Sequence, residues 1–151
     1  MNKKIAFACD HRGFPIKGKV IDFLTSKKYE VIDCGTNSEQ PADYPDFIFA
    51  AAEKVEKGVC GRAIGACYTG IGSAIAANKV FGVRAALVNG VKEAELSRAH
   101  NDANMLILGA GFLNPEDLLK IIETWLTTPF EGGRHARRLN KIKDYEQKHC
   151  R

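Results

Sequence analysis

Residues 63–77 read A-I-G-A-C-Y-T-G-I-G-S-A-I-A-A. The stretch opens with small and apolar residues from 63 to 67, which are typical of a short buried strand. Gly70 and Gly72 follow, and then the good helix formers Ala74, Ala76 and Ala77. A strand that passes through a glycine-bearing loop into a helix is the repeating unit of α/β proteins with a parallel sheet.

The same alternation extends to both sides of this unit. Further strands are predicted at residues 5–9, 30–34, 83–88 and 105–108. Helices are predicted after Pro15, from about Phe47 to Gly58, over 92–100, after the capping residue Asn114 and over about 133–149. Five strands alternating with helices predict an α/β fold, a three-layer αβα sandwich around a Rossmann-like five-stranded parallel sheet.

Length and composition agree with one domain over residues 1–151. The chain has a mass of 16.6 kDa, with 45% hydrophobic and 26% charged residues. These are ordinary globular values, which argue against a disordered, collagen-like or coiled-coil chain. No apolar stretch approaches the roughly 20 residues that cross a bilayer, and the apolar run 5–9 is too short for a secretion signal. We therefore expect a cytoplasmic location and no membrane partner.

Cysteines and charge restrict the partners further. The five cysteines, at positions 9, 34, 60, 67 and 150, match no zinc-binding spacing, so we expect free thiols and no metal. The net charge is +4, and seven basic residues face two acidic ones between positions 132 and 151. This basic tail suits an anion of any size, from a small phosphate to a nucleic acid.

Two segments lie where open α/β sheets bind their ligands, beyond the carboxyl ends of strands. Asp10 and His11 follow the first strand; Asp10 either caps a turn or orients His11 as a proton carrier. Residues 67–72 follow the third strand, and their glycine loop can offer N–H groups to a phosphate or an oxyanion. Cys67 is either a thiolate favoured by the helix start or a small buried hydrophobe.

Three further motifs are weaker evidence for a binding site. Residues 13–20 approach a P-loop but end in Val20, which has no hydroxyl for Mg²⁺, and residues 70–75 lack the third small residue of a dinucleotide fingerprint. Arg134 and Arg138 stand four apart on one helical face, which is either a solvated basic surface or a phosphate grip.

Five segments together carry a resemblance to a known family. They are Cys9-Asp10-His11, Asp43-Tyr44-Pro45-Asp46, Cys67-x-Thr69-Gly70-Ile71-Gly72, Leu96-Ser97-Arg98-x-His100-Asn101-Asp102 and Pro129-Phe130-Glu131-Gly132-Gly133-Arg134-His135. In this order and spacing, over nearly the whole chain, they resemble the ribose-5-phosphate isomerase B family. The chain is similar also to the subunits of galactose-6-phosphate isomerase.

The resemblance implies a cofactor-free isomerase of the pentose phosphate pathway. It would interconvert ribose 5-phosphate and ribulose 5-phosphate through a cis-enediolate, as a homodimer or a tetramer with shared active sites, and without a nucleic-acid partner. Cys67 would be the general base, Thr69 and the N–H groups of Gly70, Ile71 and Gly72 would hold the enediolate oxygen, and Asp10 and His100 would assist ring opening. Asn101 and Tyr44 would position the sugar, and His11, Arg134 and Arg138 would bind the phosphate.

Some features set this chain apart. The family usually has Gly where Tyr68 stands, often Ser at Ala74, and commonly a phosphate-contacting Arg at Gly111. His100 precedes the fifth strand, so we expect it at the opposite edge of the sheet from Cys67, serving a neighbouring chain.

Two other functions stay open: an isomerase of a hexose 6-phosphate, such as allose or galactose 6-phosphate, and a noncatalytic module that binds a phosphorylated ligand.

Overall fold

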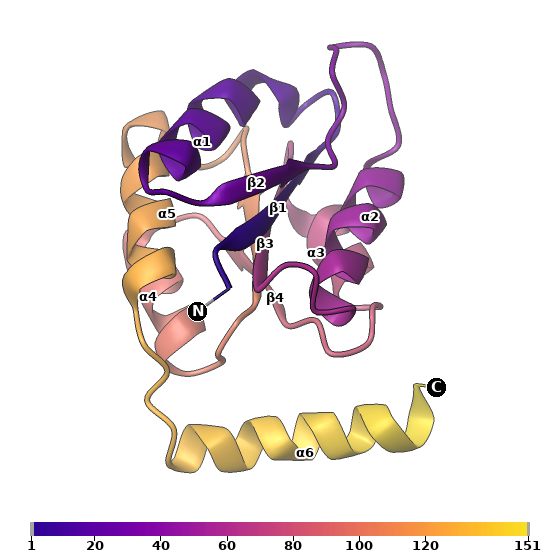
Figure 1. Cartoon of the computed structure of the whole chain (residues 1–151), viewed down its shortest axis with the longest axis vertical. Coiled ribbons are helices and arrows are strands. Elements are labelled where there is room, and N and C mark those ends of the chain that lie inside the picture. Colours follow the sequence, from indigo (N-terminus) through magenta and orange to yellow (C-terminus); the bar gives the residue numbers. More distant parts are fainter. Residues whose placement is uncertain (1, 151) are drawn as a thin grey trace.

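A five-stranded parallel sheet forms the centre of the molecule (Figure 1). The computed structural model describes residues 2–150. The strands are β1 (Lys4–Cys9), β2 (Glu30–Asp33), β3 (Arg62–Cys67), β4 (Ala85–Val88) and β5 (Met105–Gly109), in the spatial order β2-β1-β3-β5-β4. All four neighbouring pairs are parallel, which confirms the predicted sheet.

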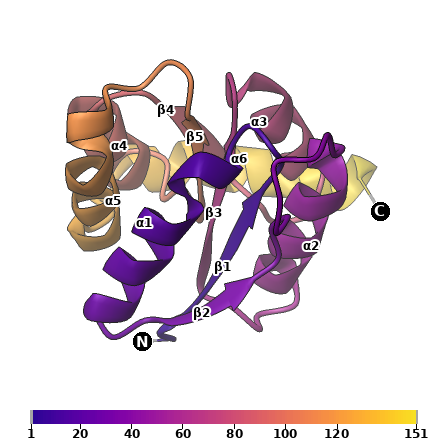
Figure 2. The ribbon, with the colours of Figure 1, turned by 90° about the horizontal axis from the view of Figure 1, so that it is seen from above.

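Helices cover both faces of the sheet (Figure 2). One face carries α1 (Phe14–Ser26), α4 (Val91–Ala99) and α5 (Leu118–Thr127), which pack around Phe7, Leu106 and Trp125. The other face carries α2 (Tyr44–Glu56) and α3 (Ile71–Ala77), which pack around Ile48 and Ile107. The predicted three-layer sandwich is therefore confirmed.

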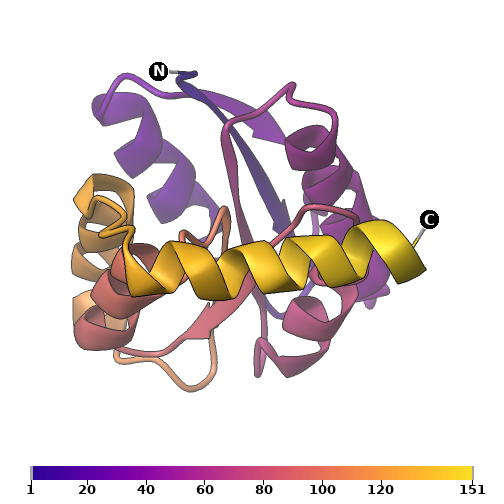
Figure 3. The same cartoon turned by 90° about the horizontal axis from the view of Figure 1, so that it is seen from below.

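The last helix, α6 (Arg134–His149), runs across the β4 side of the sheet, close to the residues that precede β4 (Figure 1 and Figure 3). His135 is its one buried residue, whereas Ile142 and Tyr145 are 56% and 65% exposed. Apolar side chains at this spacing are normally covered. Helix α6 thus presents an uncovered apolar stripe. None of the helices in residues 2–150 is both long enough and apolar enough to cross a membrane.

Several element ends shift by one residue from the sequence prediction, and three further differences have a local cause. The fourth strand begins at Ala85 rather than at 83, because the Arg84 N–H donates to Asn104 Oδ1 at 2.7 Å instead of joining the ladder. The second helix begins at Tyr44, before Phe47, with Pro45 in its first turn. Asn114 caps a short 3-10 turn, η1 (Pro115–Asp117), and α5 follows it.

Candidate active site

The carboxyl ends of β1 and β3 bring two predicted segments to one edge of the sheet. These strands are neighbours, with Cys9 opposite Ala66, so the loops that follow them start side by side. Asp10 and His11 lie in the first loop, and Cys67 is the last residue of β3. The predicted grouping of these side chains at the carboxyl edge is therefore present within one chain.

The glycine loop folds back onto the Cys67 sulfur. The thiol is only 5% exposed, and its Sγ accepts a hydrogen bond from the Gly70 N–H at 3.2 Å. Gly70 has φ +78° and packs directly against Leu87, so a side chain here would be both strained and obstructed. A backbone donor aimed at sulfur bonds a thiolate more strongly than a thiol, which suits a base.

Thr69 and Tyr44 complete this half of the site. The Thr69 hydroxyl accepts from the Ile71 N–H at 3.1 Å, so that N–H already has a partner. Gly72 and its N–H open the first turn of α3, where a helix leaves its own donors unpaired. The Tyr44 ring and hydroxyl, from the first turn of α2, lie directly over Gly72 and leave no space for a side chain there.

Asp10 and His11 have separate partners. Asp10 is 6% exposed, and its Oδ1 accepts from the N–H groups of Arg12 and Gly13, both at 2.9 Å. It therefore closes the turn into α1, as the capping interpretation predicts. The His11 Nδ1 accepts from the Ala42 N–H at 3.1 Å. The alternative pairing of Asp10 with His11 is not formed, because backbone groups take up both side chains.

A buried lysine that the sequence analysis did not single out holds the loop facing His11. Lys17 is 8% exposed, and its amine lies 2.6 Å from Asp33 Oδ2. It also donates to the Thr36 carbonyl and to Asn37 Oδ1, both at 2.8 Å. These bonds fix the loop 34–43 that carries Ala42. The sequence does contain a sign of this role, because Lys17 stands one turn before Val20 on the apolar face of its helix.

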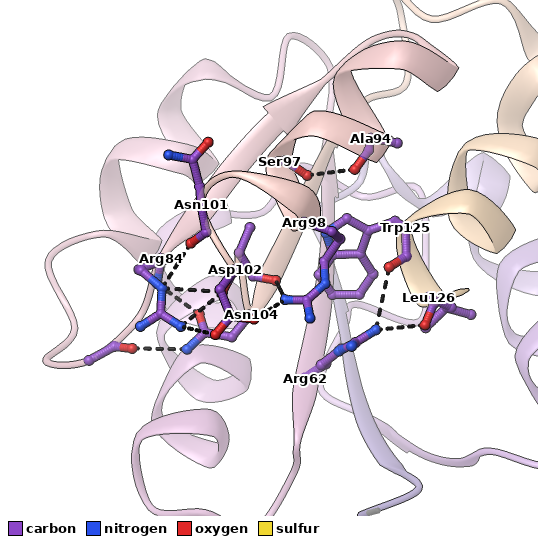
Figure 4. Close-up of polar contacts among 12 residues, drawn as sticks. Arg62, Arg84, Ala94, Ser97, Arg98, Asn101, Asp102, Asn104, Trp125 and Leu126 are labelled. Atoms are coloured by element: carbon purple, nitrogen blue, oxygen red, sulfur yellow. Dashed lines mark hydrogen bonds and ion pairs between the residues drawn. The ribbon is translucent and has the colours of Figure 1, made fainter. Parts of the chain in front are cut away.

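The turn after α4 is held by two arginines (Figure 4). Arg84 donates to the carbonyls of Asn101 and Asp102 at 3.1 and 2.8 Å, and Arg98 contacts Asp102 Oδ1 at 2.8 Å. Asp102 adopts φ +43°, a conformation that Asp tolerates better than most residues. The network binds the backbone and leaves the exposed Asn101 side chain pointing away from it.

His100 stacks on His135 beside the start of α6. Their ring centroids are 4.1 Å apart at 11°, and Glu131 Oε2 lies 3.9 Å from His100 Nε2 and 3.4 Å from His135 Nε2. Burial lowers the pKa of His135, and His100 and Arg134 lower it further. The rings are nearly parallel, so their in-plane lone pairs do not converge on one ion, which does not suit a metal site. His135 Nε2 is buried and has no hydrogen-bond partner among residues 2–150.

The predicted residues therefore form two groups. His100 and Asn101 lie between α4 and the amino end of β5, and Arg134 and Arg138 are exposed on α6, whose first turn packs on His100. Cys67 lies at the carboxyl edge, opposite Gly109, the last residue of β5. A single chain does not bring the two groups together, as expected from the place of His100 before β5.

Tyr68 lies at the rim beside Cys67. Its ring is 43% exposed, packs directly on Gly111 and meets Phe112 edge-on with centroids 5.6 Å apart. A side chain at Gly111 would occupy the place of this ring. Tyr68 and Gly111, two of the residues that depart from the family pattern, therefore depend on each other, because the ring of one fills the space beside the other.

Comparisons with known proteins agree with this arrangement. A family model for Ribose/Galactose Isomerase matches residues 5–142. Ribose-5-phosphate isomerase B of Escherichia coli (strain K12) is 42% identical over 146 residues, covering 97% of this chain and 98% of that protein.

Solved structures show the same fold. Clostridium thermocellum ribose-5-phosphate isomerase B has a TM-score of 0.94 at 47% identity, covering 97% of this chain and 99% of that one. Ribose-5-phosphate isomerase B from Mycoplasma genitalium with bound ribulose-5-phosphate has a TM-score of 0.92 at 43% identity, covering 95% and 96%. By sequence and by fold, the chain belongs to the ribose/galactose isomerase family.

Proposed function

We propose that the protein is an aldose–ketose isomerase that interconverts ribose 5-phosphate and ribulose 5-phosphate. The observation that carries this proposal is the buried Cys67 thiol, whose sulfur accepts the Gly70 N–H at the carboxyl edge of the sheet. Membership of the family supports it, as does the relative whose structure contains bound ribulose-5-phosphate. The five free thiols suit a reducing compartment, which supports a cytoplasmic location.

The chemistry needs one base and one oxyanion site. The Cys67 thiolate takes the proton from C2 of the open-chain aldose, and the C1 carbonyl oxygen takes up the negative charge of the enediolate. A proton then passes from the O2 hydroxyl to O1, and the thiol returns its proton to C1 as the carbonyl forms at C2. Thr69 and the Gly72 N–H, in the open first turn of α3, hold the enediolate oxygen, because the Gly70 and Ile71 N–H groups already have partners. Asp10 keeps one carboxylate oxygen outside its turn bonds, which can accept a sugar hydroxyl proton during ring opening.

A second copy of the chain completes the site in this proposal. His100 would assist ring opening, Asn101 and Tyr44 would orient the sugar, and Arg134 and Arg138 would join His11 at the phosphate. Because the His100 group lies at the far edge of the sheet, it can reach Cys67 only from a neighbouring chain.

The surface of the chain supports such a homodimer. Ile71 and Ile75 of α3 are 57% and 58% exposed, and Ile142 and Tyr145 of α6 are also uncovered. A groove of about 490 Å³ runs between the α6 stripe and the amino end of β4. Exposed apolar side chains in this number on a small chain are typical of a protein interface.

The test is turnover of purified protein on a sugar-phosphate panel. We expect ribulose 5-phosphate to form from ribose 5-phosphate, and Cys67→Ala to lower kcat by roughly 10²–10⁴-fold. Cys150→Ala, an exposed thiol on α6's end, is the matched control and should keep full activity. A higher kcat/KM on allose or galactose 6-phosphate would identify a hexose-phosphate isomerase instead. Ligand binding without turnover on any sugar would identify a binding module.

A further inference from the structure

Arg12 is the only arginine or lysine in the loops at the Cys67 edge of the sheet. These loops follow the five strands and comprise residues 10–13, 34–43, 68–70, 89–90 and 110–114, all within the described chain. Arg12 is exposed, and no carboxylate of residues 2–150 lies within ion-pair distance of it. Lys17 enters this region from α1, but it is buried and already paired with Asp33. Arg12 is thus the one unpaired permanent cation at this edge.

An aromatic platform holds the Arg12 guanidinium in place. Its central carbon lies 4.1 Å from the centroid of the Tyr68 ring. That ring is itself backed by Gly111 on one side and by the edge of Phe112. The Arg12 side chain makes no hydrogen bond within residues 2–150 beside this ring contact, so its N–H groups stay available for a phosphate, which a guanidinium can bind in bidentate fashion.

The platform stands next to the chemical groups of the site. Arg12 follows His11 in the first loop, and Tyr68 follows Cys67 in the third, on neighbouring strands. We propose that Arg12 is a further substrate-binding residue, which takes the phosphate of the sugar phosphate bound at Cys67, and that Tyr68 is its positioning residue. The inference rests on the proposed isomerase function. It would give each chain its own phosphate-binding arginine, in addition to those expected from the partner.

The experiment compares Arg12→Met with Lys19→Met. Lys19 is an exposed base of α1 without an ion pair in the described chain, so its variant removes the same charge from the same region. We expect Arg12→Met to raise both the KM for ribose 5-phosphate and the competitive Ki of inorganic phosphate by about tenfold, with kcat within about twofold. Lys19→Met should leave all three constants at the wild-type values.

Two variants of Tyr68 test the platform. Tyr68→Phe keeps the ring and should keep the wild-type KM and Ki, whereas Tyr68→Leu should raise both in the same direction as Arg12→Met. Wild-type KM and phosphate Ki in Arg12→Met would overturn the inference, and so would a loss of kcat with an unchanged Ki. If the wild type turned over no ribose 5-phosphate, the proposed function would fail. Calorimetric binding of inorganic phosphate to the wild type and to Arg12→Met would still decide the role of Arg12.

Discussion

Burial keeps three of the five cysteines in the thiol form. Burial raises the pKa of Cys9 to about 11, although Lys17 partly opposes this. Burial also raises the pKa of Cys34 and of Cys60. These three sulfurs are therefore held as thiols near neutral pH, and they are poor nucleophiles and poor bases. The Cys67 sulfur instead accepts the Gly70 N–H of the glycine loop.

We expect alkylation to follow this division. With iodoacetamide at pH 7.5, Cys67 and the exposed Cys150 should be modified, whereas Cys9 and Cys60 should remain intact, and activity should fall with the modification of Cys67. Peptide mass spectrometry of timed samples measures this, and Cys150→Ser removes the exposed thiol as a control. Modification of Cys9 before activity is lost would contradict the assignment.

Much of the site could be predicted from the types of residue that follow the strands. Cys67 and Asp10 could be placed because short apolar runs end directly before a glycine loop and a polar pair. The stacking of Arg12 on Tyr68 could not, because it joins two loops that only the sheet brings together. The stacking of His100 on His135 could not be predicted either, because it depends on the direction in which α6 runs relative to the rest of the chain.

At the scale of elements, the turn between α4 and β5 depends on a buried cation. Arg98 has a side chain only 7% exposed and contacts Asp102, which Arg84 also contacts at 3.2 Å. Removing one partner of a buried charge leaves the other desolvated without compensation. The position of His100 and Asn101 therefore rests on this carboxylate.

Asp102→Asn should lower the free energy of unfolding by about 1–3 kcal/mol, because a neutral amide replaces the charged partner of Arg98. The variant keeps a residue that tolerates φ +43°. Urea denaturation measures the loss. Asp144→Asn, at an exposed position of α6, is the control and should stay within about 0.5 kcal/mol of the wild type. Equal losses in both variants would show that the Arg98 contact is not stabilising.

The contact between α4 and α6 makes stability depend on pH. Burial, His100 and Arg134 lower the pKa of His135 from its ordinary 6.5, with a smaller contribution from Arg138, while Glu131 acts in the opposite sense. The unfolded chain then binds the proton more readily than the folded one, so stability is full above pH 6.5 and falls as the pH drops below it.

His135→Gln should therefore flatten the decrease in Tm between about pH 7.5 and pH 5.5. His149→Gln, exposed on the same helix, should follow the wild-type curve. Scanning fluorimetry over the pH series provides the measurement. If His135→Gln also followed the wild-type curve, this histidine would not carry the dependence.

Element boundaries were harder to predict than element identity. Residues 83 and 84 read as part of a strand, but Asn104 takes the Arg84 N–H and donates to the Gly82 carbonyl at 2.9 Å, which holds them in the preceding turn. Tyr44 joins α2 because Pro45 suits a first helical turn, whereas the cluster of Pro and Asp residues around it read as a loop. A tertiary contact decides the first case and local helix chemistry the second.

At the scale of the whole molecule, the two groups of site residues predict complementation between defective chains. Cys67→Ala and His100→Ala should each be inactive alone. If the sites are shared, a mixed dimer contains one intact site, and random reassociation should restore about one quarter of wild-type activity. Mixing after mild denaturation and refolding, followed by the ribose 5-phosphate assay, measures this. No recovery, although native mass spectrometry detects mixed dimers, would show that each chain acts alone.

The ring of Tyr68 lying on Gly111 has a consequence for how this protein can change by mutation. The two positions should show epistasis, because the ring occupies the space that any side chain at 111 needs. Gly111→Ala should displace the ring and the Arg12 stacked on it, yet the same change should be harmless in a Tyr68→Gly background. A double-mutant cycle on KM should give a coupling of roughly 0.5–3 kcal/mol. As related sequences diverge, a side chain at position 111 should accordingly appear only together with loss of the ring at position 68.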